Sequence, residues 1–282
     1  MGRMARGWQL TKQSWAVVRG DRSLAVFPLV SGVAALITVA VFAAAGLGVY
    51  NASGAEWTLI PVAVVGVYFL IVIGVFCSVA LCACATRALD GEQTTVGEGL
   101  SAARGRLGLI FQWAAVQLVV GAIISALEAL LKEGAGALIG SIVGGLANVA
   151  WAVATYFVVP VLALEGLGPK DALKRSTSVV RARWGEGVTG AGVIGVVFLL
   201  AGFLPALVLI GLGVVAAKDD TPLAVALIAI GTVVFIVALL LQATVVSVFK
   251  VALYRFAVDG TVAGGFDAEQ LQSAFKPKRS RR

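Results

Sequence analysis

The sequence predicts an all-α membrane protein, a polytopic helix bundle with six transmembrane helices arranged as three hairpin repeats. Three observations predict this fold class: the composition, the length of the apolar segments and an internal repeat. Of the 282 residues, 60% are hydrophobic and only 13% are charged. A soluble domain carries about 25% charged residues, so the composition indicates a membrane protein.

Six apolar stretches are long enough to cross a bilayer as helices and contain no charged residue. A hydrocarbon core of roughly 30 Å requires about 20 apolar residues of helix. A membrane β-barrel is excluded, because its strands would alternate polar and apolar residues. The apolar run of the first stretch exceeds the length of a signal peptide, so we expect an uncleaved first span. The predicted spans are roughly 24–50, 57–85, 107–127, 137–164, 188–217 and 222–249. Together they form a transmembrane domain over 1–265, followed by a basic tail over 266–282.

Lysine and arginine are concentrated on one side of the predicted spans. The segments 1–23, 86–106, 165–187 and 250–282 contain 20 of the 22 basic residues. The positive-inside rule therefore predicts that both termini lie in the cytoplasm and that the protein is in the cell membrane. We attribute the net charge of +7 to this orientation and to contact with anionic lipid headgroups, and expect no nucleic-acid partner.

Two sequence patterns recur in the three predicted hairpins. The segment Lys12–Arg19 resembles Lys174–Arg181, and Ser101–Arg106 is a weaker third copy. Each returning span ends in an acid followed by glycine, which suits a helix C-cap with a left-handed residue. The sequence predicts three units, each with a short amphipathic cytoplasmic helix, two spans and this ending; chance similarity is the alternative. The three endings are Asp90-Gly91, Glu165-Gly166 and Asp259-Gly260, and we expect these acids to meet arginines of the repeat, with Arg19, Arg104 and Arg181 as candidates.

The short cytoplasmic helices each carry an apolar stripe with basic residues beside it. In the first helix, Trp8, Trp15 and Val18 fall on one stripe at helical spacing. Such a helix can lie in the membrane interface, with tryptophan among the headgroups and arginine reaching phosphate. The alternative, left open, is that the stripe packs on the protein's own surface. The candidate headgroup contacts are Trp8, Trp15, Arg19, Arg22, Arg104, Arg106, Arg181, Arg183 and Trp184.

Small and amide side chains within the spans form two further candidate sets. Gly136, Gly140 and Gly144 have the spacing of residues that let membrane helices approach closely, and we favour packing inside the protein over a dimer seam. Amide side chains in the spans are candidates for interhelical hydrogen bonds or for the lining of a polar path. These amides are Gln112, Gln117, Asn148 and Gln242.

The sequence predicts no catalytic, cofactor-binding or metal-binding residues. The chain contains no histidine, which removes the most frequent general base and a common metal ligand. Cys77, Cys82 and Cys84 fall one short of the usual four ligands of a structural zinc site, so we expect small apolar filler with reduced thiols. No charge lies within a predicted span, although such charges usually mark ion or proton coupling. We therefore expect no enzyme.

Two segments resemble known families of membrane proteins. The opening, with Ser14-Trp15, Arg19, Asp21 and Phe27-Pro28, resembles an uncharacterised family of six-helix integral membrane proteins common in actinobacteria. The segment 169–184, with Ser176 and Arg181-Ala182-Arg183-Trp184, is similar to one in a wider set of bacterial membrane domains. That set includes the membrane domain attached to some glycerophosphodiester phosphodiesterases. The resemblance implies an architecture and no activity.

Two classes of function are compatible with these patterns. The first is a non-catalytic membrane scaffold that interacts with lipid or with a partner through the cytoplasmic helices and the basic tail. The second is a small-solute transporter or channel component, which would require the span amides to converge. The expected partners are the lipid bilayer, chiefly its anionic headgroups, and a membrane protein or a second copy of the chain.

The predicted orientation can be tested by cysteine labelling in a background in which the three native cysteines are replaced. Single cysteines near Ser53 and Asp220 should react with an impermeant thiol reagent in intact cells, because both positions lie on the outer side. Cysteines near Gln93 and Ser280 should react only after lysis. Labelling of the second pair in intact cells would contradict the orientation.

Overall fold

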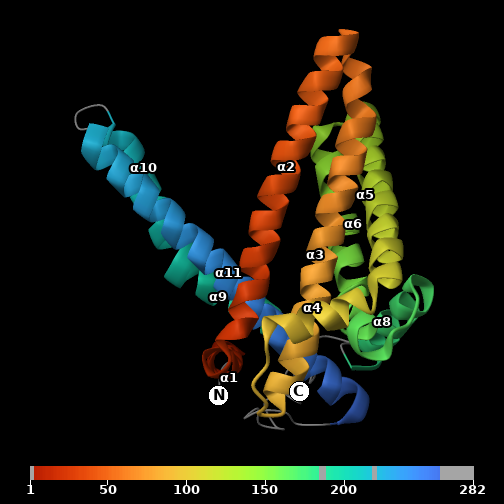
Figure 1. Ribbon diagram of the computed structural model, residues 1–282, viewed down its shortest axis with the longest axis vertical. Coiled ribbons are helices and arrows are strands. Elements are labelled where there is room, and N and C mark those ends of the chain that lie inside the picture. The colour runs from red at the N-terminus through yellow and green to blue at the C-terminus, as the bar shows by residue number, and fades with distance from the viewer. Residues whose placement is uncertain (1–2, 184–188, 218–220, 261–282) are drawn as a thin grey trace, which may run out of the picture. The chain divides into compact units, whose positions relative to one another are not determined.

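The computed structural model describes residues 3–183, 189–217 and 221–260, and within these ranges it contains helices and no strand (Figure 1). Six helical stretches are long and apolar enough to cross a membrane: Arg22–Ser53, Glu56–Leu89, Leu107–Gly134, Ala137–Glu165, Ile194–Ala216 and Thr221–Asp259. The predicted all-α class with six apolar spans is confirmed. The arrangement of the spans as three repeated hairpins stays a prediction.

The chain divides into two compact units, which we describe separately. Unit 1 comprises residues 1–28, 85–94 and 184–282, and unit 2 comprises residues 29–84 and 95–183. Unit 1 contains α1 (Arg3–Gly20), the 3-10 turn η1 (Arg22–Ala25), α9 (Thr189–Phe198), the π-turn η4 (Leu199–Phe203), α10 (Leu204–Ala216) and α11 (Thr221–Asp259). Unit 2 contains most of α2 (Val26–Ser53) and of α3 (Leu59–Leu89), the 3-10 turn η2 (Glu56–Thr58), α4 (Val96–Arg104), α5 (Leu107–Ala135), α6 (Ala137–Ala154), α7 (Val158–Pro160), the π-turn η3 (Val161–Glu165) and α8 (Pro169–Arg183).

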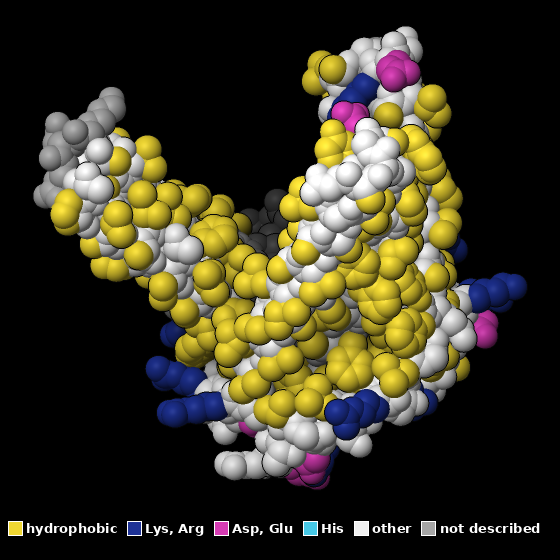
Figure 2. Space-filling model, turned by 45° about the horizontal axis from the view of Figure 1, so that its top comes forward, with side chains coloured by type: hydrophobic (Ala, Val, Ile, Leu, Met, Phe, Trp, Pro, Cys, Tyr) yellow, Lys and Arg dark blue, Asp and Glu magenta, His cyan; other side chains and the backbone are white. Residues whose placement is uncertain are grey.

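The long helices expose much of their apolar surface. Leu36 of α2 is 72% exposed and Leu138 of α6 is 74% exposed, and Figure 2 shows hydrophobic side chains over the helix surfaces. In water, each exposed apolar Å² would cost about 25 cal/mol relative to burial. In a bilayer the same surface faces hydrocarbon, while the helical backbone keeps its hydrogen bonds internal. The exposure is therefore that expected of helices surrounded by lipid.

The buried core lies toward the helix ends that adjoin the basic segments. In unit 1, Leu24 and Phe27 are fully buried, and most residues of α11 from Thr244 to Ala257 are buried. In unit 2, the fully or almost fully buried residues include Ala80 and Leu81 of α3, Ile110 and Trp113 of α5, and Phe157, Val158 and Leu162. For each unit taken by itself, we call the end that adjoins its basic segments the basic side.

Helix α11 extends well beyond the predicted sixth span. It has 39 residues, or about 58 Å at 1.5 Å per residue, and ends at Asp259 instead of near residue 249. The predicted span ended at residue 249, before Lys250, because a charge is costly in lipid, but a lysine does not end a helix. Between Pro222 and Leu241 the only polar side chain is Thr232, whereas polar side chains are frequent from Gln242 onward.

Glycines set the close approach of α10 and α11 in unit 1. A Cβ atom at Gly213 would lie 3.0 Å from the carbonyl oxygen of Ala224, and one at Gly231 would lie 2.9 Å from that of Ala206. Real Cβ atoms hardly ever approach backbone so closely. The two helices can pack at this distance only because neither position carries a side chain.

Two of the three glycines predicted to pack lie against α5 in unit 2. A Cβ atom at Gly140 would lie 2.7 Å from the backbone nitrogen of Lys132, and one at Gly144 would lie 2.5 Å from the carboxylate of Glu128. Gly136 has a different role. Its φ of 97° is one that L side chains rarely adopt, and nothing lies within 4 Å of its Cβ position. The helix-packing role predicted for Gly136 is wrong, because this residue forms the turn between α5 and α6.

The three acid-glycine endings share one backbone conformation. Gly91, Gly166 and Gly260 have φ values of +83°, +66° and +69°, all in the left-handed region that glycine adopts without strain. The prediction of left-handed glycines at the ends of the three returning helices is confirmed.

The contact at Gly140 predicts a difference between two neighbouring alanine substitutions. Gly140→Ala should lower the free energy of unfolding by about 1–3 kcal/mol, because the added methyl group meets backbone atoms of α5. Gly145→Ala is the matched control, since nothing lies within 4 Å of its Cβ position. Denaturant titration of the purified protein in detergent micelles provides the measurement. Equal destabilisation by both changes would contradict the packing of α6 on α5.

Candidate functional site

The amide side chains of unit 2 do not converge on a polar path. Gln112 and Gln117 are separated by five residues of α5, or about 140° around the helix, and Gln112 is exposed. Asn148 is exposed, and its Nδ2 donates a hydrogen bond of 2.9 Å to the carbonyl oxygen of Gly144 on its own helix. Within the described residues no hydrogen bond joins these three side chains. Gln242 lies in unit 1, where it is half-buried, with its Nε2 4.0 Å from the Cβ position of Gly195.

Among the arginines of unit 2 that were predicted to contact headgroups, two are exposed and one covers a helix end. Arg104 on α4 and Arg181 on α8 are exposed. The guanidinium of Arg106 lies over Gly166, where a Cβ atom would collide with it. Arg106 therefore packs on the end of the fourth span, and this contact also explains why residue 166 has no side chain.

Helix α8 packs on its own unit. The hydroxyl of Ser176 is fully buried; it donates to the carbonyl oxygen of Ala154 at 2.7 Å and accepts from the backbone N–H of Phe157 at 3.1 Å. These bonds satisfy backbone groups where the fourth span is interrupted between α6 and α7. For α8 the structure favours packing on the protein surface over the membrane interface. The side chains of Trp8 and Arg183, Trp184 and the tail 276–282 lie outside the described residues.

Helix α1 brings three of the predicted headgroup contacts together. It packs on α9 and α11 through a face that includes the buried residues Ser14 and Val18. Trp15 is half-buried beside this face and Arg19 is exposed. The guanidinium carbon of Arg19 lies 5.8 Å from the centre of the Trp15 ring, within the range of a cation–π contact.

These side chains line an open groove of about 580 Å³. The groove is lined by Trp15, Val18, Arg19, Arg22, Ala25 and Leu241, and we call it the basic groove. One wall is an aromatic ring with two arginines, and another is the apolar side chain of Leu241 on α11. In chemical terms it offers hydrogen-bond donors for an anion next to an apolar surface.

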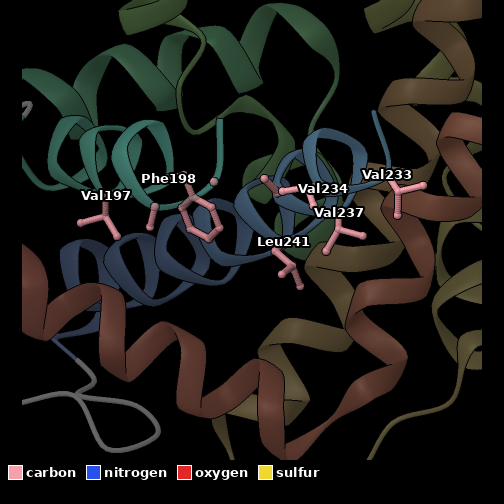
Figure 3. Close-up of a pocket in the computed structure, with 9 residues that line it drawn as sticks. Val197, Phe198, Val233, Val234, Val237 and Leu241 are labelled. Carbon is pink, nitrogen blue, oxygen red and sulfur yellow. The ribbon is translucent and has the colours of Figure 1, made fainter. Parts of the chain in front are cut away.

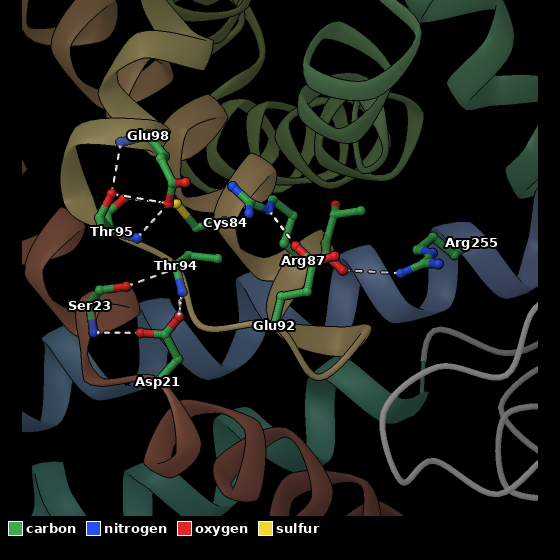
Figure 4. A network of polar contacts seen from close by, with 10 residues as sticks. Asp21, Ser23, Cys84, Arg87, Glu92, Thr94, Thr95, Glu98 and Arg255 are labelled. Carbon is green, nitrogen blue, oxygen red and sulfur yellow. Dashed lines mark hydrogen bonds and ion pairs between the residues drawn. The ribbon is translucent and has the colours of Figure 1, made fainter.

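A buried carboxylate fixes the turn that carries both arginines. Asp21 is 8% exposed and Thr94 is 7% exposed. Asp21 accepts hydrogen bonds from the backbone N–H of Ser23 at 3.0 Å, the backbone N–H of Thr94 at 2.9 Å and the hydroxyl of Thr94 at 2.6 Å (Figure 4). The Ser23 and Thr94 hydroxyls are 3.1 Å apart. The turn between α1 and α2 is thereby joined to the loop that follows α3.

The sequence explains the local conformation of this turn. Asp21 caps η1 with its side chain, as short acidic residues commonly do at the start of a helical turn. Arg19 therefore lies two residues before this fixed backbone position, and Arg22 lies directly after it. The carboxylate points toward Thr94, whose backbone N–H and hydroxyl donate hydrogen bonds to its charge.

A second set of contacts holds the loop before Thr94. Arg255 of α11 forms an ion pair with Asp90 at 2.9 Å and donates to the carbonyl oxygen of Thr86 at 3.1 Å. Arg87 pairs with Glu92 at 2.8 Å. In unit 2, Arg175 pairs with Glu165 at 3.2 Å. The expected pairing with Arg19, Arg104 or Arg181 is therefore wrong for Asp90 and Glu165. Asp90 meets Arg255 of α11, and Glu165 meets Arg175, another arginine of the repeat segment.

The electrostatics of the basic groove follow from these contacts. Burial alone would raise the pKa of Asp21, but the hydrogen bonds from Ser23 and Thr94 outweigh it, and the pKa lies below its ordinary value. Asp21 is therefore charged at neutral pH. Among the described residues, neither Arg19 nor Arg22 forms an ion pair. Two guanidinium groups thus line the groove with no acidic side chain bound to them.

The described residues contain no group of three or more side chains that could hold a metal ion. Cys77, Cys82 and Cys84 are buried and form no disulfide. The thiol of Cys84 lies 3.7 Å from the carbonyl oxygen of Thr95, to which it donates.

Three residues of this region were not predicted from the sequence: Thr94, Leu241 and Arg255. Asp21 directly before Arg22-Ser23 has the pattern of a cap, but nothing in the sequence indicates which distant segment meets its second oxygen. Leu241 is one of many leucines in an apolar span. Arg255 stands out only as one of two basic residues in the last turns of α11, and its partner could not be inferred from spacing.

The Asp21 network predicts a pH-dependent loss of stability. Asp21→Asn should lower the free energy of unfolding at pH 7 by about 2 kcal/mol, because hydrogen bonds to a buried charge are lost. A carboxyl whose native pKa is depressed stabilises the fold above its unfolded pKa of about 3.9, and this contribution is lost as the pH falls through the native value. The difference between wild type and variant should therefore shrink below about pH 4.

Glu92→Gln is the matched control for this prediction, because it removes an exposed ion pair. It should cost less than about 1 kcal/mol. Denaturant titration in micelles at pH 7 and pH 3 measures both variants. A difference for Asp21→Asn that stays constant across this range would show that the carboxylate charge does not hold the turn.

Comparison with known proteins identifies a family for this chain. A family of unknown function, DUF6159, matches residues 55–265, well over half of the chain. No curated protein and no solved structure matches the chain. The matched residues include α11 with Leu241 and exclude α1, Arg19 and Arg22. The chain belongs to DUF6159, a family of unknown function.

Proposed function

We propose that this protein is a non-catalytic multi-pass membrane protein that binds anionic lipid headgroups in the basic groove and so organises lipid, or a partner protein, at the membrane surface. One observation carries the proposal. Arg19 and Arg22 line an open groove beside Trp15 and Leu241, and neither arginine forms an ion pair among the described residues.

The chemistry of the groove matches a phosphate-bearing headgroup. A guanidinium presents a planar set of donors that binds phosphate oxygens in pairs, and such charge-assisted bonds are stronger than neutral ones. Each basic residue near an anionic membrane surface contributes about 1 kcal/mol of attraction. The tryptophan ring fits the same boundary, where amphipathic aromatic side chains are enriched.

The depth of the groove supports its placement at the headgroup level. From Thr221 to Leu241, α11 rises about 30 Å at 1.5 Å per residue, which is the thickness of a hydrocarbon core. Leu241 also marks the point at which polar side chains become frequent along α11. We therefore place one membrane boundary near Leu241, with the buried end of α11 on the basic side of it.

The orientation belongs to the same proposal. The concentration of lysine and arginine on one side supports a cytoplasmic location for the basic groove and for both termini in the cell membrane. Anionic lipids of the cytoplasmic leaflet would then be the local source of headgroups.

The threefold repeat is also proposed, and two features support it. The three acid-glycine endings share the left-handed conformation. Ser14 and Ser176, at matching places in the two similar segments, are both fully buried. The similarity of segment 169–184 to the membrane domain of some glycerophosphodiester phosphodiesterases, and the link to actinobacteria, stay predictions and carry no part of the argument.

The proposal is tested by lipid binding to the full-length protein in detergent, followed by native mass spectrometry. Wild type should retain phosphatidylglycerol in preference to phosphatidylcholine. The double variant Arg19→Gln, Arg22→Gln should lose about 30-fold in phosphatidylglycerol affinity, since two basic residues contribute about 1 kcal/mol each. Added salt should weaken the wild-type preference.

Arg104→Gln provides the matched control, because Arg104 is exposed on α4 and does not belong to the lining of the basic groove. It should leave the preference for phosphatidylglycerol unchanged. Equal retention of the two lipids by wild type, or an equal loss in Arg104→Gln and in the double variant, would contradict the proposal. Binding to a partner protein would then be the leading account of the basic side.

A further inference from the structure

A second groove of unit 1 shares one lining residue, Leu241, with the basic groove. It lies between α11 on one side and α9 with η4 on the other, and it has a volume of about 320 Å³ (Figure 3). Its lining includes Val197, Phe198 and Ala201 on one wall, and Val233, Val237 and Leu241 on the other. We call it the apolar groove.

Leu241 lines both grooves, so the two adjoin at this side chain. Val233, Val237 and Leu241 are spaced by four residues and lie along one face of α11. They cover about 12 Å of the helix axis. The apolar groove thus leads from the arginines into the part of α11, Pro222–Leu241, that has no charged residue.

The backbone of the opposite wall departs from a regular α-helix at this place. The π-turn η4 runs from Leu199 to Phe203 and supplies Ala201 and Gly202 to the lining. A Cβ atom at Gly202 would lie 2.6 Å from that of Ala238, so η4 and α11 touch at this point and leave the groove beside it. Single π-turns within α-helices occur frequently at functional sites.

We propose that the two grooves together hold one anionic phospholipid, with its phosphate at Arg19 and Arg22 and one acyl chain in the apolar groove. This inference rests on the proposed headgroup binding and extends it to the whole lipid. The order of the two linings carries it: two arginines with no ion pair among the described residues, then Leu241, then an apolar groove along α11. A phospholipid has the same order of charge and hydrocarbon.

Two features select the molecule that occupies the grooves. The arginines of the basic groove favour a negative charge, and the lining of the apolar groove favours hydrocarbon. A zwitterionic lipid would bring a cation toward Arg19 and Arg22, and would bind less well. A helix of a second copy would fill the apolar groove without bringing an anion to the arginines. The anionic phospholipid is the occupant that satisfies both ends.

Photo-crosslinking in nanodiscs tests the assignment with the full-length protein. The discs contain phosphatidylcholine with a trace of phosphatidylglycerol that carries a diazirine in its acyl chain, and matched discs contain the phosphatidylcholine analogue. We expect crosslinks at 197–201 and 233–241, at least fivefold stronger with the phosphatidylglycerol probe. Unlabelled phosphatidylglycerol should compete for them.

Variants that fill the groove provide the decisive comparison. Ala201→Phe should reduce these crosslinks at least fivefold, and Val237→Phe, from the opposite wall, should do the same. Leu200→Phe is the matched control, because Leu200 is exposed and lies outside the lining. A far-UV circular dichroism spectrum and a gel-filtration profile verify that each variant is folded.

The possible failures are distinguishable. If groove-filling variants leave the crosslinks unchanged while Arg19→Gln, Arg22→Gln still lowers phosphatidylglycerol retention, headgroup binding stands and the assignment of the acyl chain is overturned. If the two probes crosslink equally and the arginine variant has no effect, the proposed function itself fails. Crosslinks from the groove to a second copy of the chain, in place of lipid, would also overturn the assignment.

Discussion

Two segments that are distant in the sequence meet at one buried carboxylate of unit 1, and an ion pair joins a third segment, α11, to one of them. Asp21 binds its own turn through Ser23 and the loop after α3 through Thr94, and Arg255 of α11 holds the start of that loop through Asp90. In lipid, apolar surface gives the helices little reason to associate, so packing and polar contacts of this kind must hold them. The position of Arg19 and Arg22 depends on this turn.

Helix α11 combines a segment suited to lipid with a segment buried in protein. Its first twenty residues or so are apolar and largely exposed, as lipid requires, while the segment from Thr244 to Ala257 is largely buried in protein. The two grooves lie at the change between these environments. An anionic lipid bound there would contact α1, η1, η4 and α11 of unit 1 at once, and would therefore stabilise the arrangement that binds it.

Much of this architecture was predictable because lipid imposes simple rules on sequence. Segment length gave the six apolar helices, and the acid-glycine pattern gave the left-handed glycines at 91, 166 and 260. The rest depends on which surfaces meet. The partner of Asp90 is Arg255, and Gly136 forms a turn although its spacing matched Gly140 and Gly144. For the basic groove, the sequence indicated Trp15, Arg19 and Arg22 as candidate headgroup contacts. It did not indicate Leu241, because hydrophobic periodicity does not show which helix packs against which.

The central claim is that an anionic lipid phosphate sits between Arg19 and Arg22. A high-resolution cryo-electron microscopy map of the protein in nanodiscs containing phosphatidylglycerol tests it most directly. We predict density for a phosphate within hydrogen-bond reach of both guanidinium groups, continuing as a chain past Leu241. A map in which the groove holds no such density, or in which another protein segment covers the two arginines, would contradict the account.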